Sequence, residues 1–210
     1  MKLLASITFF LCLLPGDSEP AWVLSKDQNG IKIYTSSNPE YAVKGVKAEL
    51  QFDAGIPQLV AVVMDVANYK NWVYNCSESR LLKQVSKNEL IYYHITHVPW
   101  PATDRDLVSR FTTRKLDETT IEISSGHLPD YMPVQKEYVR VKRTEARWKF
   151  TQLANGKVQA EYRLFFDPGG SVPAWMMNLF ITDGPYQTLF NMRQEVKKEG
   201  YAKAKMADYF

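Results

Sequence analysis

The spacing of apolar side chains changes along the first third of the chain. Residues 46–52 alternate apolar and polar positions, and residues 30–34 repeat this pattern over a shorter stretch, as is typical of half-buried strands. Between residues 56 and 67 the apolar positions recur at helical spacing, and Pro57 suits the first turn of a helix. We therefore predict two strands followed by a helix that ends before residue 69.

From residue 80 onward the pattern is that of one short strand after another. Asn155-Gly156 is a strong two-residue hairpin signal between the last two strands. Because the connections are short, we expect an antiparallel meander. The predicted strands are residues 80–85, 89–97, 105–116, 119–125, 138–142, 146–153 and 158–166.

A long C-terminal helix is predicted to pack on the apolar face of this sheet. Residues 168–171 form a turn, Pro173 fits a first helical turn, and apolar residues recur at helical spacing to residue 180. The helical pattern breaks at Gly184-Pro185 and resumes to residue 196. The apolar side of the last strand consists of Val158, Ala160, Tyr162, Leu164 and Phe166.

A curved sheet around one helix encloses more space than the helix alone fills. The positions expected to point inward include large rings, such as Trp148 and Phe150, and small side chains, such as Ala48 and Ala160. The space is occupied either by the large side chains or by an apolar ligand. Composition leaves both alternatives open.

Two segments carry a resemblance to a known family. Residues 98–110, VPWPATDRDLVSR, resemble a proline-aromatic-proline turn and the Arg-Asp strand that follows it in the START (StAR-related lipid transfer) domain family. Residues 167–178, DPGGSVPAWMMN, resemble the turn and helix opening of the same family, most of all in its phosphatidylcholine-transfer-type members. The order of elements agrees from about residue 31 to residue 198.

The resemblance implies an α+β helix-grip fold, in which a curved antiparallel sheet wraps around a long C-terminal helix and encloses a hydrophobic tunnel. It further implies a lipid ligand and a gate formed by the loop at residues 126–133 together with the helix. The expected gate residues are Leu128, Tyr131, Met132 and Met176. Combined with the alternation of the strands, it gives as expected ligand-binding residues Tyr93, Arg105, Leu107, Ser109, Ile123, Trp148, Phe150, Tyr162, Leu164, Trp175 and Leu179.

Arg105 is expected to point inward because it shares the alternation of Leu107 and Ser109. A buried guanidinium needs a partner, which is either a lipid phosphate or hydroxyl or an internal carboxylate such as Asp104 or Asp106. Many family members carry a second buried arginine six residues later, where this chain has Phe111. Arg110 has the opposite alternation and is expected outside, so the identity of the ligand does not carry over.

The aromatic and titratable residues leave further alternatives open. Trp148, Tyr162 and Tyr93 form either plain core or a cage for a quaternary ammonium group. The histidines lack the spacing of metal ligands, and no nucleophile with a base or phosphate loop is evident, so neither a metal nor a cofactor is expected. An enzyme using Arg105, Tyr162 and His97 as acid-base groups is the alternative to a non-catalytic lipid carrier.

Charge argues against a nucleic-acid partner. The formal net charge is only +3, and acidic residues are interleaved with basic ones. The densest basic stretch, residues 140–149, places its charges largely at alternating positions, which predicts a solvated strand face. Brief contact with anionic lipid headgroups stays compatible with this pattern.

The N-terminus reads as an export signal. Lys2 precedes an apolar run at residues 5–14, and small residues at Gly16 and Ser18 suit cleavage after Ser18. We expect a signal peptide at residues 1–18 and one monomeric lipid-binding domain at residues 19–210, periplasmic in a Gram-negative bacterium and otherwise secreted. Three function classes follow: a lipid carrier, a cavity enzyme, and a protein that associates with a partner in response to lipid.

Overall fold

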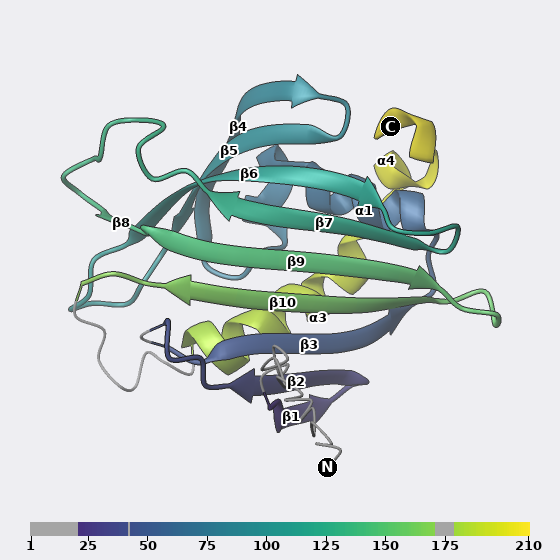
Figure 1. Ribbon diagram of the computed structural model, residues 1–210, viewed down its shortest axis with the longest axis horizontal. Helices are drawn as coiled ribbons and strands as arrows, with labels where there is room; N and C mark the ends of the chain where they lie inside the picture. The colour runs from purple at the N-terminus through teal and green to yellow at the C-terminus, as the bar shows by residue number, and fades with distance from the viewer. Residues whose placement is uncertain (1–20, 42, 171–178) are drawn as a thin grey trace, which may run out of the picture.

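The chain folds around one ten-stranded sheet, seen across its outer face in Figure 1. The computed structural model describes residues 21–41, 43–170 and 179–210, and the side chains of residues 181–210 in the last of these ranges. The strands are β1 (Val23–Gln28), β2 (Ile31–Ser36), β3 (Gly45–Phe52), β4 (Cys76–Ser86), β5 (Glu89–Thr96), β6 (Arg105–Lys115), β7 (Thr120–His127), β8 (Val139–Arg140), β9 (Arg143–Gln152) and β10 (Val158–Asp167).

The strand order is β1-β2-β3-β10-β9-β7-β6-β5-β4, and every neighbouring pair along this path is antiparallel. The predicted meander is therefore confirmed, and its last strand returns to pair with β3. Alternation in β10 is also confirmed, because Val158 and Ala160 are fully buried on the inner face. The short β8 lies off the path and pairs with β6 in parallel.

The helices lie behind the sheet in Figure 1 and cover its inner face. They are α1 (Ile56–Met64), a 3-10 turn η1 (Val66–Asn71), a π-helical turn η2 (Leu179–Asp183), α3 (Gly184–Glu195), α4 (Glu199–Ala202) and a second 3-10 turn η3 (Met206–Asp208). The predicted break at Gly184-Pro185 is where η2 ends and α3 begins. In the parts of the chain that the structure describes, no helix is both long and apolar enough to span a bilayer.

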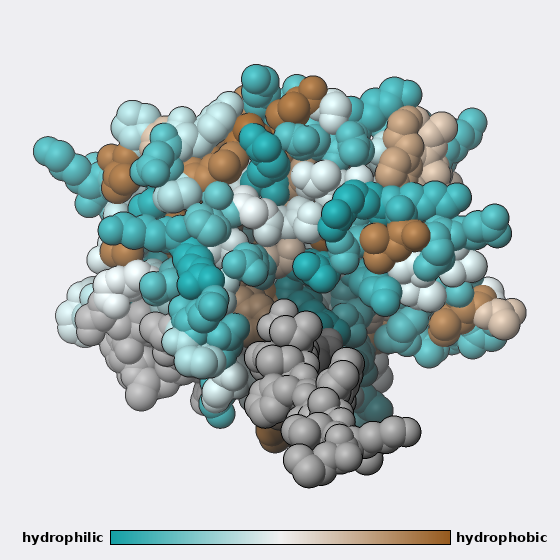
Figure 2. All heavy atoms as spheres, viewed as in Figure 1, coloured by the Kyte–Doolittle hydropathy of each residue, from teal (hydrophilic) through white to brown (hydrophobic). Residues whose placement is uncertain are grey.

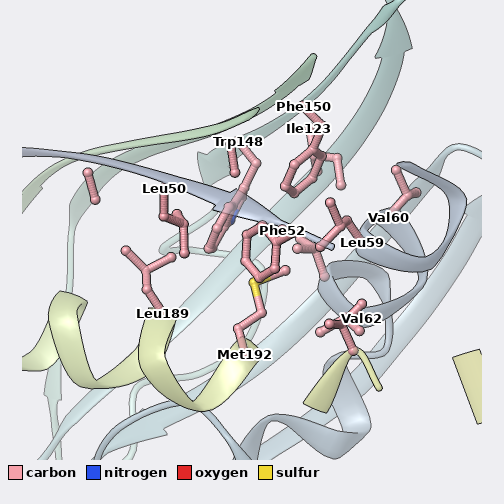
Figure 3. Close-up of a cluster of buried hydrophobic side chains, with 14 of the residues drawn as sticks. Leu50, Phe52, Leu59, Val60, Val62, Ile123, Trp148, Phe150, Leu189 and Met192 are labelled. Carbon is pink, nitrogen blue, oxygen red and sulfur yellow. The ribbon is translucent and has the colours of Figure 1, made fainter. Parts of the chain in front are cut away.

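The main core lies between the sheet and these helices, as Figure 3 shows. Phe52 from β3 and Phe150 from β9 point toward Leu189 and Met192 of α3, and all four are at most 2% exposed. α1 closes the neighbouring part of this layer with its buried apolar residues. The inner face is thus filled with side chains at this end of the sheet.

A second, smaller apolar cluster lies on the outer face. Tyr93, Ile91 and Ile95 of β5 pack with Val108 of β6. Leu128 and Met132, from the loop between β7 and β8, are partly buried against this cluster. Because this loop covers the sheet, β5 is buried on both faces. Elsewhere Figure 2 shows a mostly hydrophilic outer face with scattered apolar residues.

Two strand predictions are corrected. β1 has no counterpart among the predicted strands, because its residues, VLSKDQ, do not alternate cleanly and most of its side chains are exposed at the edge of the sheet. The strand predicted at residues 138–142 is reduced to two residues and runs parallel to β6, since it follows the covering loop instead of a hairpin. The solvated alternation expected along residues 140–149 therefore fails at Arg140, which is 5% exposed.

Candidate functional site

An apolar chamber of about 200 Å³ lies between the inner face of the sheet and the start of α3. Its wall is supplied by η1 and the segment after it, by β5, β6, β7, β9 and β10, and by Thr188 from α3. We call it the inner chamber. Much of its surface consists of aromatic rings, namely Tyr69, Trp72, Tyr92, Phe111, Trp148, Tyr162 and Phe166.

A second cavity of about 150 Å³ adjoins the first, and we call it the outer chamber. The two chambers share Val73, Thr96, Tyr162, Leu164 and Thr188 as lining residues. Pockets for drug-sized ligands usually measure roughly 300–1,000 Å³. Joined, the chambers fall at the lower end of that range, so the interior next to the filled core contains space for a ligand.

A buried histidine lines the inner chamber next to Thr96, which lines both chambers. His94 Nε2 lies 2.9 Å from Thr96 Oγ1, and His94 Nδ1 lies 3.7 Å from the Cys76 Sγ. Burial lowers the pKa of His94 to about 4 and raises the pKa of the Cys76 thiol to about 12. The imidazole is therefore neutral and the thiol protonated near neutral pH, so this pair is not an activated nucleophile.

Arg105 lines the inner chamber and is 4% exposed, as its alternation predicts. Nη1 donates to the Thr103 carbonyl at 2.5 Å, and Nε and Nη2 donate to the carbonyls of Pro168 and Gly169 at 3.4 Å. The ion pair with Asp104 or Asp106, one of the two alternatives for its partner, is absent among the described residues. Arg105 instead holds the turn that leads toward the C-terminal helical segment.

Glycine is required in that turn. Gly169 has a φ of +65°, and a Cβ there would lie 3.2 Å from Cγ1 of Val139. The left-handed conformation favours glycine, and the close approach of β8 leaves little room for a side chain. The Pro-Gly-Gly sequence at residues 168–170 thus allows the turn to contact both Arg105 and β8.

The structure places five of the predicted ligand-binding residues in the wall of the inner chamber. They are Arg105, Leu107, Trp148, Tyr162 and Leu164. Their contact with a ligand stays a prediction. Ser109, Ile123 and Phe150 also face inward but are fully buried, the serine bonded to Ser125 at 2.8 Å and the other two in the core. Trp175 lies outside the described residues, as does the side chain of Leu179.

The predicted inward orientation of Tyr93 is wrong. Tyr93 packs in the outer cluster, and its hydroxyl donates to Asp106 at 3.2 Å. Its neighbour Tyr92 faces the inner chamber instead. The cage of Trp148, Tyr162 and Tyr93 is therefore not assembled, and Trp148 and Tyr162 contact each other directly with ring centroids 4.3 Å apart.

The predicted position of the gate loop is also wrong in the part that the structure describes. Leu128 and Met132 pack on the outer cluster, and Tyr131 is exposed above it. Arg140 reaches under this loop and donates to the carbonyls of Pro129, Met132 and Pro133. None of these loop residues lines either chamber. Met176, the remaining expected gate residue, lies outside the described residues.

A different loop borders the chambers. Residues 97–104 connect β5 to β6, and Thr96 and Arg105 at its two ends both line the inner chamber. Trp100 in this loop is 89% exposed. His97 pairs with Asp104 at 3.1 Å at the base of the loop. His97 does not line the chambers, so the three acid-base groups considered for an enzyme are not brought together.

Several wall residues were missed by the sequence analysis, including Tyr92, His94 and Thr96 of β5. They lie opposite Ser109, Leu107 and Arg105 of β6 in the sheet register. These partners were all expected to face inward, so the pairing register would have identified them. The alternation within β5 could not identify these wall residues, because both faces of this strand are apolar.

Relatives with related sequences are found in bacteria and mammals. A Pseudomonas aeruginosa protein, PA1579, described as uncharacterized, is 33% identical over 177 residues, which cover 84% of this chain and 87% of that protein. The phosphatidylcholine transfer protein of Bos taurus is 25% identical over 177 residues, which cover 81% of each chain.

Solved structures agree with the fold. A crystal structure of a StAR-related lipid transfer protein from Xanthomonas axonopodis has a TM-score of 0.78 at 30% identity, covering 84% of this chain and 99% of that one. The START domain family itself matches residues 11–200. The predicted helix-grip fold is thereby confirmed, and the chain belongs to the START domain family of lipid-binding proteins.

Proposed function

We propose that this protein binds one hydrophobic ligand in the joined chambers and carries it between membranes outside the cytoplasm. The observation that carries the proposal is the pair of adjoining apolar chambers beside a core that is otherwise filled. Membership of the START family supports it, as does the similarity to a phosphatidylcholine transfer protein. The pattern of residues 1–18 supports export.

The chambers favour a kinetic role. Burying a methylene group from water is worth about 0.8 kcal/mol, so a sixteen-carbon chain gains on the order of 12 kcal/mol. Taken from a bilayer, the same chain gains almost nothing, because its surroundings are apolar in both states. A carrier of this kind therefore shields the ligand during transit, and selectivity arises from polar contacts and cavity shape.

The loop at residues 97–104 is our candidate for contact with the membrane. Trp100 is almost fully exposed, and amphipathic indole rings favour the interface between headgroups and acyl chains. Both ends of the loop line the inner chamber, so a membrane contact here would be coupled directly to the cavity. The loop that carries Tyr131 lacks this connection.

Transfer between vesicles tests the proposal. Purified protein is expected to yield bound lipid on extraction and to accelerate movement of a fluorescent lipid from donor to acceptor vesicles. Trp100→Ala should slow this transfer, whereas the matched change Tyr131→Ala should leave it unchanged. Protein that contains no lipid and does not accelerate transfer would refute the carrier function. Slower transfer by Tyr131→Ala, with normal transfer by Trp100→Ala, would instead indicate that the loop at residues 126–133 forms the gate.

A further inference from the structure

A polar groove of about 570 Å³ lies where the end of α3 meets the start of β2, the end of β3 and the start of β10. It is larger than either chamber and shares no lining residue with them. Leu50 and Phe52, which line it, belong to the filled core shown in Figure 3. The groove is therefore a separate site, and its volume lies in the usual range for small-molecule ligands.

Cations outnumber carboxylates in the wall of the polar groove. Both carboxylates are already paired, Asp53 with Lys157 at 3.1 Å and Glu49 with Lys47 at 2.9 Å. Three further cations line the groove, and none of them forms an ion pair with a carboxylate in the part of the chain that the structure describes. They are Lys32, Arg193 and Lys197.

The backbone brings these three cations close to one another. Arg193 donates from Nη2 to the Gly30 carbonyl at 3.1 Å and from Nη1 to the Asn29 carbonyl. These bonds hold its guanidinium at the turn that directly precedes β2 and Lys32. Lys197 follows Arg193 by four residues, and the backbone at the C-cap of α3 stays helical, so their side chains are neighbours.

Folding alone does not explain this arrangement. The C-terminal end of a helix favours cations, which accounts in part for Arg193 and Lys197, but like charges four residues apart repel each other. Lys32 lies on β2, where Asp27 and Glu49 are its cross-strand neighbours in the sheet register. Neither of these carboxylates forms an ion pair with it among the described contacts. The wall thus has positive charge available for an anion.

We propose that the polar groove binds a phosphate group, carried either by a small polar molecule or by a lipid headgroup. A phosphate monoester has a charge of about −1.5 to −2 near pH 7 and several acceptor oxygens, so it matches a cluster of cations better than a single carboxylate does. The turn before β2 uses only part of the N–H donors of Arg193. The remaining wall includes three amide side chains, which suit hydroxyl groups beside the phosphate, namely Gln51, Gln159 and Gln194.

Two probes distinguish the sources of the phosphate. Titration calorimetry of the full chain with glycerol 3-phosphate should show saturable binding that weakens with salt, whereas glycerol should not bind. Sedimentation with phosphatidylcholine vesicles, with and without phosphatidic acid, gives the second arm. Binding that requires phosphatidic acid, without binding of glycerol 3-phosphate, would assign the phosphate to a membrane surface.

Matched double variants locate the phosphate. Lys32→Gln with Lys197→Gln should weaken binding roughly tenfold, about the contribution of two exposed ion pairs. Lys70→Gln with Lys83→Gln removes the same charge at exposed lysines outside the groove and should leave binding unchanged. Equal weakening by both double variants, or no phosphate-dependent binding in either arm, would overturn the proposal.

Extraction of bound lipid keeps this test apart from the carrier function. Both double variants should retain the lipid content of the unchanged chain, because the groove and the chambers share no residue. Loss of bound lipid from the first variant alone would contradict the separation of the two sites.

Discussion

Arg105 and Arg140 are both almost fully buried, at 4% and 5% exposure, but the two faces of the sheet satisfy them differently. On the outer face, Arg140 forms two hydrogen bonds to Asp106, at 2.9 and 3.0 Å, and also binds the covering loop. On the inner face, Arg105 has only backbone carbonyls as partners among the described residues, and it stands beside a cavity. The arginine on the outer face thus has a carboxylate partner, whereas the described residues give the arginine beside the cavity only backbone carbonyls as hydrogen-bond acceptors.

This difference suggests that the outer face mainly stabilises the fold, whereas the inner face provides the space for a ligand. The outer cluster and its ion pair fix β8 and the loop before it, and the neighbouring Val139 of β8 packs against Gly169 in the turn that Arg105 holds. The inner face keeps space next to a filled core. We therefore expect changes on the outer face and in the filled core to affect folding most, and changes in the chamber wall to affect ligand uptake most.

The largest expected effect is that of Asp106→Asn. The substitution leaves the Arg140 charge buried without its carboxylate, which should lower the free energy of unfolding by about 3–5 kcal/mol. Urea denaturation monitored by fluorescence measures the loss. Glu89→Gln is the control, because it breaks the surface pair with Arg110, which is 48% exposed, and should cost less than about 1 kcal/mol. Equal losses in both variants would contradict the distinction between the two faces.

Next in size is a pair of leucine truncations on the inner side. Leu189 is fully buried in the core, and Leu189→Ala should cost about 3 kcal/mol through lost burial and the cavity it leaves. Leu164 already borders both chambers, so Leu164→Ala removes fewer contacts and should cost roughly 1 kcal/mol. Chemical denaturation compares them directly. A Leu164→Ala loss as large as that of Leu189→Ala would mean that the chamber wall is packed like the core.

Titration of His94 gives a smaller, pH-dependent effect. Its pKa is lowered from 6.5 to about 4 in the folded protein, so the unfolded chain binds more protons between these values. The resulting stability is fully present above pH 6.5 and is lost as the pH falls toward 4. We expect a loss of roughly 2 kcal/mol between pH 7 and pH 5.

Denaturation at the two pH values tests the titration of His94. His94→Phe should remove most of the pH dependence in this range, whereas His127→Gln, at a half-buried histidine outside the chambers, should retain it. An unchanged pH dependence in His94→Phe would show that other groups cause it. The same measurement at high salt separates this effect from surface charge, which salt screens.

Much of this fold was predictable because short stretches of sequence carry the signals for individual strands and helix ends. The alternation of residues 158–166 predicted both β10 and its inner face, and Gly184-Pro185 predicted the change of helix at the start of α3. The same alternation rule placed Arg105 inward and Arg110 outward, and both predictions are confirmed. These positions lie on long strands with one apolar face, for which only one pairing register buries the apolar side chains.

The predictions failed where a distant segment decides burial. β5 is apolar on both faces, so its alternation could not distinguish Tyr92 from Tyr93 until the covering loop was known. Arg140 lies in a strand of two residues, too short for a period to be recognised, and its burial depends on Asp106 and on the loop carbonyls. The loop at residues 128–133 was expected beside the cavity for the same reason, whereas Arg140 holds it against the outer face.

The smallest expected effect on stability comes from filling the inner chamber. Ala146 lines this chamber, so Ala146→Leu places three added carbon atoms in existing space and should change the free energy of unfolding by less than about 1 kcal/mol. Ala160 is fully buried in the core, and Ala160→Leu should cost roughly 1–3 kcal/mol by overpacking.

Ligand uptake should follow the opposite order for these two alanines. Ala146→Leu occupies part of a chamber of about 200 Å³ and should reduce lipid capture several-fold, as measured by extraction after incubation with vesicles. Ala160→Leu should retain capture at temperatures where it is folded, because the chamber wall is unchanged. Undiminished capture by a stable Ala146→Leu would mean that the ligand does not occupy the inner chamber. The hollow on the inner face would then be a packing defect of the sheet and not its binding site.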